Sequence, residues 1–274
     1  MASGTSLAES GALGQDAEAP AALSVEGLTV KYGAFTALQD LTFEVRAGEI
    51  LGIIGPNGAG KSSSFAGITA SVKRTGSVLL HGRPMDRAST QELSRRGLRR
   101  TFQNNSFFGE LTVLENAMSA FQSDGSSSSS LLESTLLPWK EARRRRGRAE
   151  SARELLVSFG IEELYHGMLP DDMPHGLQRM LSIVVAYGAG VDVLLVDEPG
   201  AGIGGDDMRA LARLLRRLRD EGIAVVLIEH HMDLVTEVCD RVLVIDRGNT
   251  IAYGVPSAVQ RDPAVLEAYL GKTA

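Results

Sequence analysis

The clearest chemical signal in this chain of 274 residues is a glycine-rich stretch at residues 55–62. Its sequence, Gly-Pro-Asn-Gly-Ala-Gly-Lys-Ser, fits the G-x-x-x-x-G-K-[ST] pattern of a phosphate-binding loop. Glycines let the backbone curl so that successive N–H groups point at a phosphate. We expect Lys61 to reach the β- and γ-phosphates of ATP, and the Ser62 hydroxyl to bind Mg²⁺. The predicted phosphate-binding residues are Gly55, Pro56, Asn57, Gly58, Ala59, Gly60, Lys61, Ser62 and Ser63.

An acidic pair supplies the second half of the predicted site. Four apolar residues, 193–196, predict a buried strand, and Asp197 and Glu198 follow at its end. Asp197 is placed to hold Mg²⁺ through water, and Glu198 to orient and polarise the attacking water. Such a pair is weak evidence alone, but it gains weight because a phosphate loop lies upstream in the same predicted sheet. The two motifs together predict ATP hydrolysis.

The elements that must position these motifs alternate between strand and helix. A short apolar run at 50–54 stops at a glycine, as a buried strand does, and a helix is expected to begin at Gly60. Strands are also expected at 193–196, 224–228, 241–246 and near Ile251, and helices at 207–219 and 232–238. This alternation predicts an α/β fold with a mainly parallel sheet and helices on both faces. Strands at 23–31, 38–45 and 77–80 precede or flank the first motif.

Two other regions differ in composition. Residues 1–22 are mostly Ala, Gly, Ser and Glu, which predicts a disordered tail ahead of a single domain over 23–271. Residues 104–178 predict a helical subdomain inserted in the α/β core, with helices at 112–121 and 140–159 and a serine-rich loop between them. The arginine run at 143–146 allows a contact with anionic lipid or nucleic acid, or a solvated helix face. We favour the solvated face.

Whole-chain composition narrows the function classes. The net charge of −6 argues against a nucleic-acid-binding surface over the whole chain. A single cysteine, Cys239, rules out an internal disulfide, so a reducing compartment and a buried apolar role are expected. The longest uncharged apolar stretch, 183–191, is far shorter than the roughly 20 residues of a membrane-spanning helix. We therefore expect a soluble chain that reaches a membrane only through a partner.

In order and spacing, these motifs resemble the ABC ATPase family over about residues 23–271. The resemblance implies a RecA-like P-loop NTPase core with an antiparallel β subdomain and an inserted α-helical subdomain. It also implies roles for three further residues. Tyr32 matches an aromatic residue that stacks on adenine. Gln103 matches a glutamine that senses Mg²⁺ and water at the hinge to the helical subdomain, and His230 matches a histidine that contacts the γ-phosphate. The implied catalytic residues are thus Glu198, His230 and Gln103, and the implied Mg²⁺ ligands, partly through water, are Ser62, Gln103 and Asp197.

A closer resemblance is to the ATP-binding subunits of branched-chain amino acid importers and their urea and amide relatives. It rests on Arg-Thr-Phe-Gln-Asn at 100–104, Leu-Thr-Val-Leu-Glu-Asn at 111–116, the arginine-rich insert, and the segments 262–263 and 267–271. These segments do no chemistry and imply a substrate class by analogy. The implied partners are two permease subunits, a second ATP-binding subunit and, indirectly, a periplasmic or surface solute-binding protein, with no nucleic acid. The implied location is peripheral, on the cytoplasmic face of the cell (inner) membrane.

The chain departs from the family at its signature loop. The family usually has Leu-Ser-Gly-Gly-Gln, or an aromatic third residue, where this chain has Met-Pro-His-Gly-Leu at 173–177. Pro174 replaces the serine that would bind the γ-phosphate of the opposite subunit, and Leu177 replaces a glutamine. Gly204 stands where Asp or Asn is usual, and His231 where an acid is common. The residues expected to act on the partner's nucleotide are Pro174, His175, Gly176, Leu177 and Gln178.

Three functions remain open on this sequence. The favoured one is a transport ATPase, one of two nucleotide-binding subunits beneath two permeases. The altered signature loop favours instead a regulatory or structural subunit that binds ATP and hydrolyses little, whereas the intact Glu198 and His230 oppose it. A soluble ABC protein of DNA repair or translation usually has two ATPase units, zinc-binding cysteines or long coiled coils, which this chain lacks. Because the altered residues are those given to the partner, we expect a heterodimer with unequal sites.

Overall fold

The structure, a computed structural model, describes residues 21–85, 88–101, 107–121, 138–188 and 190–270. Most of the expected N-terminal tail, Gln103 and the serine-rich loop lie outside these residues. The first strand begins at Ala21, two residues before the predicted start of the domain, because Ala22 is already buried. Within the described part of the chain, no helix is long and apolar enough to cross a bilayer.

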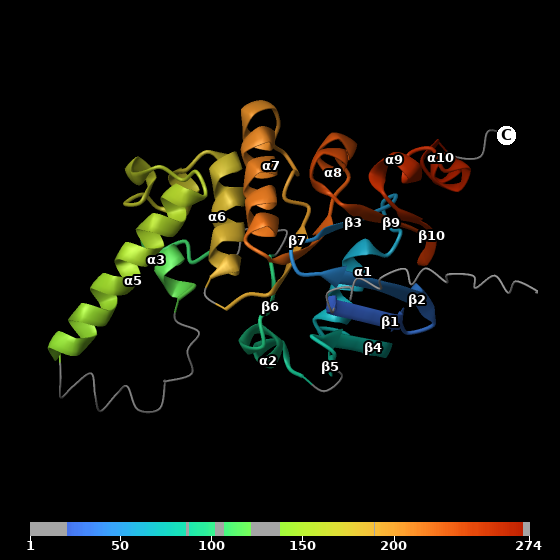
Figure 1. Ribbon diagram of the computed structural model, residues 1–274, viewed down its shortest axis with the longest axis horizontal. Helices are drawn as coiled ribbons and strands as arrows, with labels where there is room; N and C mark the ends of the chain where they lie inside the picture. Colours follow the sequence, from blue (N-terminus) through green and yellow to red (C-terminus); the bar gives the residue numbers. More distant parts are fainter. Residues whose placement is uncertain (1–20, 86–87, 102–106, 122–137, 189, 271–274) are drawn as a thin grey trace, which may run out of the picture.

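A six-stranded sheet forms the core, in the order β10-β9-β3-β8-β7-β6 (Figure 1). All neighbouring pairs are parallel except β10 with β9. Parallel pairing brings the carboxyl ends of β3, β7 and β8 to one edge, where Asp197 stands beside Ile228. The strands are β3 (Ile50–Ile54), β6 (Leu98–Arg100), β7 (Val193–Asp197), β8 (Ala224–Ile228), β9 (Arg241–Asp246) and β10 (Asn249–Gly254).

A second, antiparallel sheet lies against one face of the first, in the order β2-β1-β4-β5. Its long strands β1 and β2 form a hairpin paired from Ala21 with Arg46 to Tyr32 with Phe35. The strands are β1 (Ala21–Tyr32), β2 (Phe35–Arg46), β4 (Arg74–Leu80) and β5 (Arg83–Pro84). The parallel core, the antiparallel sheet and the inserted helices confirm the predicted fold class.

Helices cover both faces of the parallel sheet. Figure 1 shows α6, α7 and α8 on one side, with α1 and the antiparallel sheet on the other. The helices are α1 (Lys61–Ile68), α2 (Thr90–Arg95), α3 (Val113–Ser119), α5 (Pro138–Ser158), α6 (His175–Tyr187), α7 (Gly205–Asp220), α8 (Met232–Val238), α9 (Pro256–Val259) and α10 (Pro263–Leu270). Two short 3₁₀ turns, η1 (Glu163–Tyr165) and η2 (Pro170–Asp172), lead into α6.

Strands buried on both faces explain why the central runs are entirely apolar. On β7, Leu194 and Val196 pack in the layer that contains Leu211 and Leu215 of α7. Leu195 packs in the opposite layer, which includes Phe65 of α1. Such strands lack the alternation of apolar and polar residues, as expected for a parallel sheet covered twice. Cys239 is a buried free thiol, which confirms its expected apolar role.

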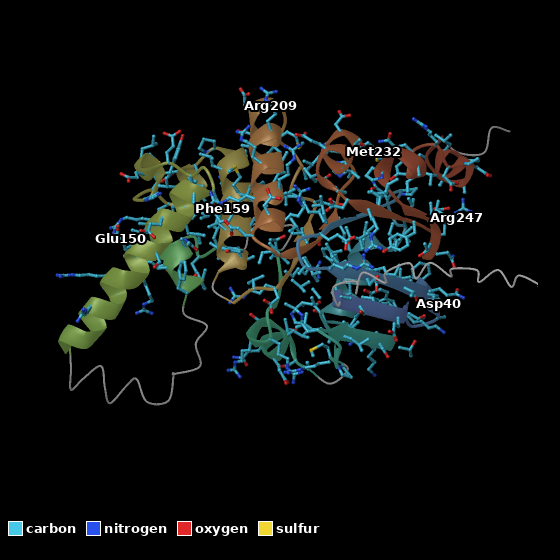
Figure 2. All side chains as sticks on the ribbon, in the orientation of Figure 1. Asp40, Glu150, Phe159, Arg209, Met232 and Arg247 are labelled. Atoms are coloured by element: carbon cyan, nitrogen blue, oxygen red, sulfur yellow. The ribbon has the colours of Figure 1, made fainter. Side chains whose placement is uncertain are left out.

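Phe159, just after α5, lies where the helical subdomain meets the core (Figure 2). Its ring packs edge-on against Tyr187 at the end of α6, with 5.4 Å between ring centroids. The guanidinium of Arg217 on α7 lies 5.0 Å from the same ring centroid. At the other end of the subdomain, Thr112 and Glu115 form a capping box at the start of α3. The aromatic contacts thus join the end of α5 to α6 and α7, and the capping box stabilises the start of α3.

Candidate functional site

The phosphate loop connects β3 to α1 and is wedged between two strand ends. Gly55 and Gly60 both have positive φ, at 153° and 111°. A Cβ added at Gly55 would stand 2.0 Å from the carbonyl oxygen of Ile245, and one at Gly60 would stand 2.5 Å from that of Ala37. Only glycine fits at these two positions. The loop is therefore held from both sides in the curled shape that a phosphate requires.

Lys61 is buried inside this loop, with 6% of its surface exposed. Its Nζ donates to the carbonyl oxygens of Gly55, at 2.7 Å, and Pro56, at 3.1 Å. Burial lowers the pKa of Lys61, and the charges of Glu198, Asp197 and Glu229 act against that fall. The ammonium group therefore stands among the carboxylates at the edge of the sheet.

Asp197, at the end of β7, is buried and contacts the last residue of the edge strand β6 and the residue after it. Its Oδ2 accepts a hydrogen bond from Nη2 of Arg100 at 2.7 Å, and its backbone N–H donates to Oγ1 of Thr101 at 3.1 Å. Arg100 also lies over the ring of Phe65 in α1, 5.4 Å from the centroid. Sequence reasoning treated Arg100 only as a subfamily marker and missed this ion pair. Spacing along the chain carries no signal for this pair, because it depends on β6 lying beside β7.

Glu198 adopts a left-handed backbone conformation, with φ at 45°. Non-glycine residues rarely take this conformation, and it persists only where the surroundings enforce it. The N–H of Glu198 donates to the carbonyl of Ile228 at 2.9 Å, which ties this residue to the end of β8. Glu198, whose side chain is half-buried, thus starts a sharp turn of the backbone directly after Asp197.

His230 follows β8, next to a fully buried carboxylate, Glu229. Oε2 of Glu229 accepts from the backbone N–H groups of His230, at 2.7 Å, and His231, at 3.0 Å. The rings of the two histidines lie 4.1 Å apart, and 47% of the His230 side chain is exposed. His230 is therefore held by its backbone while its imidazole remains open to a ligand. Sequence reasoning assigned no role to Glu229, although a carboxylate ending an apolar strand beside that histidine was a visible signal.

The remaining residues that are predicted to bind the nucleotide lie beside this edge of the sheet. Ser62 and Ser63 stand in the first turn of α1, directly after Lys61. Tyr32 ends β1 beside Phe35, with 48% of its surface exposed, on the same hairpin that contacts Gly60 through Ala37. Its exposed ring is available for stacking on a base. Gln103 lies outside the described residues, so its predicted role stays a prediction.

The signature loop belongs to the helical subdomain and starts α6. Pro174 is the N-cap residue, with ψ at 141°, and the helix begins at His175. Gln178 is buried, and its Nε2 donates to the carbonyl of Met173 at 2.9 Å. Leu177 packs against the core. These two side chains therefore stabilise the loop itself, whereas Pro174 and His175 are exposed. Action of this loop on a partner's nucleotide stays a prediction.

Comparisons with known proteins agree with this geometry. Residues 38–201, more than half of the chain, match the family described as ABC transporter. The chain belongs to the ATP-binding cassette family of ABC transporters. Its C-terminal residues 249–274 match a second family, described as branched-chain amino acid ATP-binding cassette transporter. The family resemblance inferred from the motifs is thus confirmed.

Relatives of this ATP-binding cassette match most of its length. It is 34% identical to the high-affinity branched-chain amino acid transport ATP-binding protein LivG of Salmonella typhimurium over 253 residues, 91% of this chain and 98% of LivG. BraF of Pseudomonas aeruginosa, which carries the same description, is 31% identical over 252 residues, with the same coverage of 91% and 98%. A solved ATP-binding cassette in its ADP conformation superposes with a TM-score of 0.77 at 28% identity, over 92% of this chain and 99% of that one.

Membership assigns the activity. The chain is an ATP-binding subunit of an ABC transporter, and its ATPase activity drives transport, as the phosphate loop and the acidic pair predicted. The comparisons do not favour the alternative of a weakly hydrolysing regulatory subunit.

Proposed function

We propose that this chain hydrolyses MgATP to power the import of branched-chain amino acids or related small polar solutes. The observation that carries the proposal is the C-terminal match to the branched-chain amino acid cassette family over residues 249–274. LivG and BraF, which carry the same substrate class in their names, match nearly the whole chain. Import places the subunit on the cytoplasmic face of the cell membrane, bound to its permeases.

The residues at the sheet edge divide the reaction between them. The phosphate loop binds the β- and γ-phosphates through backbone N–H groups and Lys61. Glu198 orients and polarises the attacking water. His230 contacts the γ-phosphate with its exposed imidazole. Tyr32 stacks on the adenine base. Positioning and charge stabilisation, rather than a covalent intermediate, supply the rate enhancement in this proposal.

The donor atoms at this edge suit Mg²⁺. Ser62 offers a hydroxyl and Asp197 a carboxylate, which are hard oxygen ligands of the kind that Mg²⁺ prefers. The carboxylate is buried and paired with Arg100, so a metal ion there would share it with that guanidinium. We propose that Ser62 and, through water, Asp197 and Gln103 hold the ion, which neutralises charge on the phosphates when it is bound.

The proposed assembly has two permeases, this chain and a different ATP-binding subunit. The reason is the signature loop, because Pro174 supplies neither a hydroxyl nor an N–H group where the family serine would bind the partner's γ-phosphate. A homodimer would carry this deficit at both sites. A heterodimer combines the intact phosphate loop, Asp197 and Glu198 of this chain with an intact signature loop. A solute-binding protein would deliver the substrate outside the cell.

Reconstitution tests this function. The chain is co-expressed with the permease and ATPase subunits encoded beside it, and the purified complex is placed in proteoliposomes with the cognate solute-binding protein. We expect leucine-loaded or valine-loaded binding protein to stimulate ATP hydrolysis and solute uptake, and the unloaded protein to do neither. Stimulation by urea or a short amide alone would instead indicate a transporter of the urea and amide class. Stimulation by none of these solutes would contradict the proposed substrate class, while basal hydrolysis would still report the ATPase.

A further inference from the structure

We propose that Glu229 is the positioning residue that locks two catalytic loops together, the turn after Glu198 and the loop that carries His230. The inference rests on the proposed hydrolysis of ATP at Glu198. Glu229 itself touches neither phosphate nor water in this account. It acts through the backbone of its neighbours, and its role differs from that of every residue assigned by the family motifs.

The contacts of Glu229 reach both loops at once. One carboxylate oxygen, Oε1, accepts the backbone N–H of Gly200 at 2.6 Å, two residues after Glu198. The other, Oε2, accepts the backbone N–H groups of His230 and His231, at 2.7 and 3.0 Å. A single side chain with no exposed surface therefore bridges segments 29 residues apart in sequence. Buried carboxylates with several N–H donors are strongly held.

Gly200 and His231 complete this arrangement. A Cβ added at Gly200 would stand 2.5 Å from Oε1 of Glu229 and 2.9 Å from Nδ1 of His231. Nδ1 of His231 lies 2.9 Å from Oε2 of Glu229, so the imidazole closes the remaining side of the carboxylate. His231 is one of the departures from the family pattern. Its contact with Glu229 gives that departure a structural partner in the same cluster.

The backbone of Glu198 shows why such a clamp is needed. With φ at 45°, Glu198 holds a conformation that a free turn would leave. Two contacts from the end of β8 oppose this relaxation. The carbonyl of Ile228 accepts the N–H of Glu198 at 2.9 Å, and Glu229 holds Gly200 on the far side of Pro199. Loss of the Glu229 carboxylate would remove this second contact and the N–H acceptor of the His230 loop together.

The decisive variant is Glu229→Gln, which keeps the size but turns one oxygen into an amide that cannot accept N–H groups. In the assembled complex we expect kcat to fall by about a hundredfold, as displacement of catalytic groups by an ångström can do. The KM for ATP and the MgATP affinity of the isolated chain should change less than about threefold, because the loop around Lys61 is built from other contacts.

Glu49→Gln is the matched control. Glu49 is also nearly buried, and it also accepts a backbone N–H, from Arg46 at 2.8 Å, and pairs with a cation, Arg241. It stands at the opposite end of β3 from the phosphate loop. The control should lower the thermal unfolding midpoint and leave kcat unchanged. A kcat loss in Glu49→Gln equal to that in Glu229→Gln would make the role of Glu229 merely structural.

Gly200→Ala attacks the same clamp from the other loop. Its Cβ would displace Oε1 of Glu229, so we expect kcat to fall at least about tenfold with little change in KM. Gly147→Ala on α5, where nothing lies within 4 Å of an added Cβ, is the matched glycine control and should behave as wild type. Wild-type kcat in Gly200→Ala or in Glu229→Gln would overturn the proposal.

Amide hydrogen exchange separates this inference from the proposed function. In the isolated chain, Glu229→Gln should raise exchange at Gly200, His230 and His231 together, by about tenfold or more, while amides of β3 keep their wild-type protection. Unchanged exchange at the three amides overturns the clamp whether or not the complex hydrolyses ATP. A wild-type complex without ATPase activity, combined with the expected exchange pattern, would instead count against the proposed function alone.

Discussion

Burial and neighbouring charged groups determine how single side chains at the sheet edge behave. Lys61 is the clearest case, because its ammonium group is enclosed by the loop that it serves and faces Asp197 and Glu198. Burial lowers the pKa of Lys61, because its ammonium group has lost part of its solvation at the predicted phosphate site.

Lys61→Ala should therefore remove tight MgATP binding. A charge-assisted contact of this kind contributes roughly 1.5–3 kcal/mol, about ten- to a hundredfold in affinity. Titration calorimetry on the purified chain measures this change. Lys31→Ala, an exposed lysine on β1, serves as the control and should bind as the wild type does. An unchanged MgATP affinity in Lys61→Ala would contradict the assignment of this loop as the phosphate-binding loop.

Arg100→Gln should make ATP binding more dependent on Mg²⁺. Arg100 shares the carboxylate of Asp197 at 2.7 Å, so it competes with a metal ion there. We expect the ratio of MgATP affinity to metal-free ATP affinity to rise, by roughly three- to tenfold if the pair contributes like an ordinary charged hydrogen bond. Calorimetry with and without Mg²⁺ gives the ratio.

Two further variants control that measurement. Arg99→Gln changes the neighbouring arginine, whose Nη1 donates to the carbonyl of Ala186, and should leave the ratio unaltered. In an Asp197→Asn background, Arg100→Gln should have no further effect on the ratio, because the shared carboxylate is gone. A fall of the ratio in the single variant would mean that Arg100 orients Asp197 for the metal instead of competing with it.

At this scale the sequence predicted the residues of the loop and the acidic pair, because a fixed pattern of glycines, lysine and serine has few uses. It did not predict Arg100 or Glu229 as parts of the site. Their roles depend on which strands become neighbours, β6 beside β7 and β7 beside β8, and spacing along the chain does not carry that information. The exposure of Pro174 and the inward turn of Gln178 likewise depend on tertiary packing.

Among whole elements, α10 has an unexpected place beside the phosphate loop. A cavity of about 460 Å³ is lined by Pro56 and Asn57 on one side and by Glu267 and Ala268 of α10 on the other. Arg247, at the β9–β10 turn, lines the same cavity (Figure 2). Burial raises the pKa of the Tyr269 hydroxyl, and a hydrogen bond with the Gly55 backbone acts against that rise. The C-terminal helix thus lies beside the loop, across this cavity.

Tyr269→Phe should weaken MgATP binding by a few fold, because a net hydrogen bond of about 1 kcal/mol that holds the loop is lost. Tyr253→Phe is the matched control, since its hydroxyl contacts the carbonyl of Glu44 at 3.4 Å, at the edge of the antiparallel sheet. Equilibrium binding of a fluorescent ATP analogue compares the two. Equal affinity in both variants would show that α10 does not support the loop.

Element prediction succeeded where burial imposes a pattern. The apolar runs of β3, β7 and β8 and the amphipathic stretch of α7 were found because their faces are dictated by the layers that cover them. No range was predicted for α2, β5, β6, α6, α9 and α10. All of them except α6 have at most eight residues, and the conformation of such short elements depends on docking against larger elements. The helix expected at 207–219 begins at Gly205 because Asp206 and Asp207 suit a first helical turn.

In the proposed heterodimer, the altered residues of this molecule lie on the face that it gives to the partner subunit. Pro174 and His175 are exposed at the start of α6, where no side-chain cap is present. Loss of one hydroxyl to a charged phosphate costs roughly 1.5–3 kcal/mol, one to two decades in rate if it is felt in the transition state. In the proposed heterodimer, the site completed by this loop is therefore the slow one.

Pro174→Ser should raise turnover at that slow site only. The serine returns a hydroxyl and an N–H group to the start of α6. In the assembled complex, this gain is measured with the fast site disabled by Lys61→Ala, which removes nucleotide binding there without trapping a closed dimer. An increase of about tenfold over Lys61→Ala alone is expected from one recovered hydrogen bond to a charged group. No increase would show that the backbone N–H groups of His175 and Gly176 already suffice.

The measurement that tests the central claim most directly is ATP turnover by the assembled complex with Glu198→Gln in this chain, set beside the equivalent change in its ATPase partner. Glutamine keeps the shape of the side chain and loses the negative acceptor for the water. We predict that Glu198→Gln still binds MgATP, traps it in a closed dimer and removes most of the hydrolysis, whereas the partner's change removes little. Wild-type turnover with Glu198→Gln would contradict this chain's role as the hydrolytic subunit, and equal losses from the two changes would contradict the unequal sites.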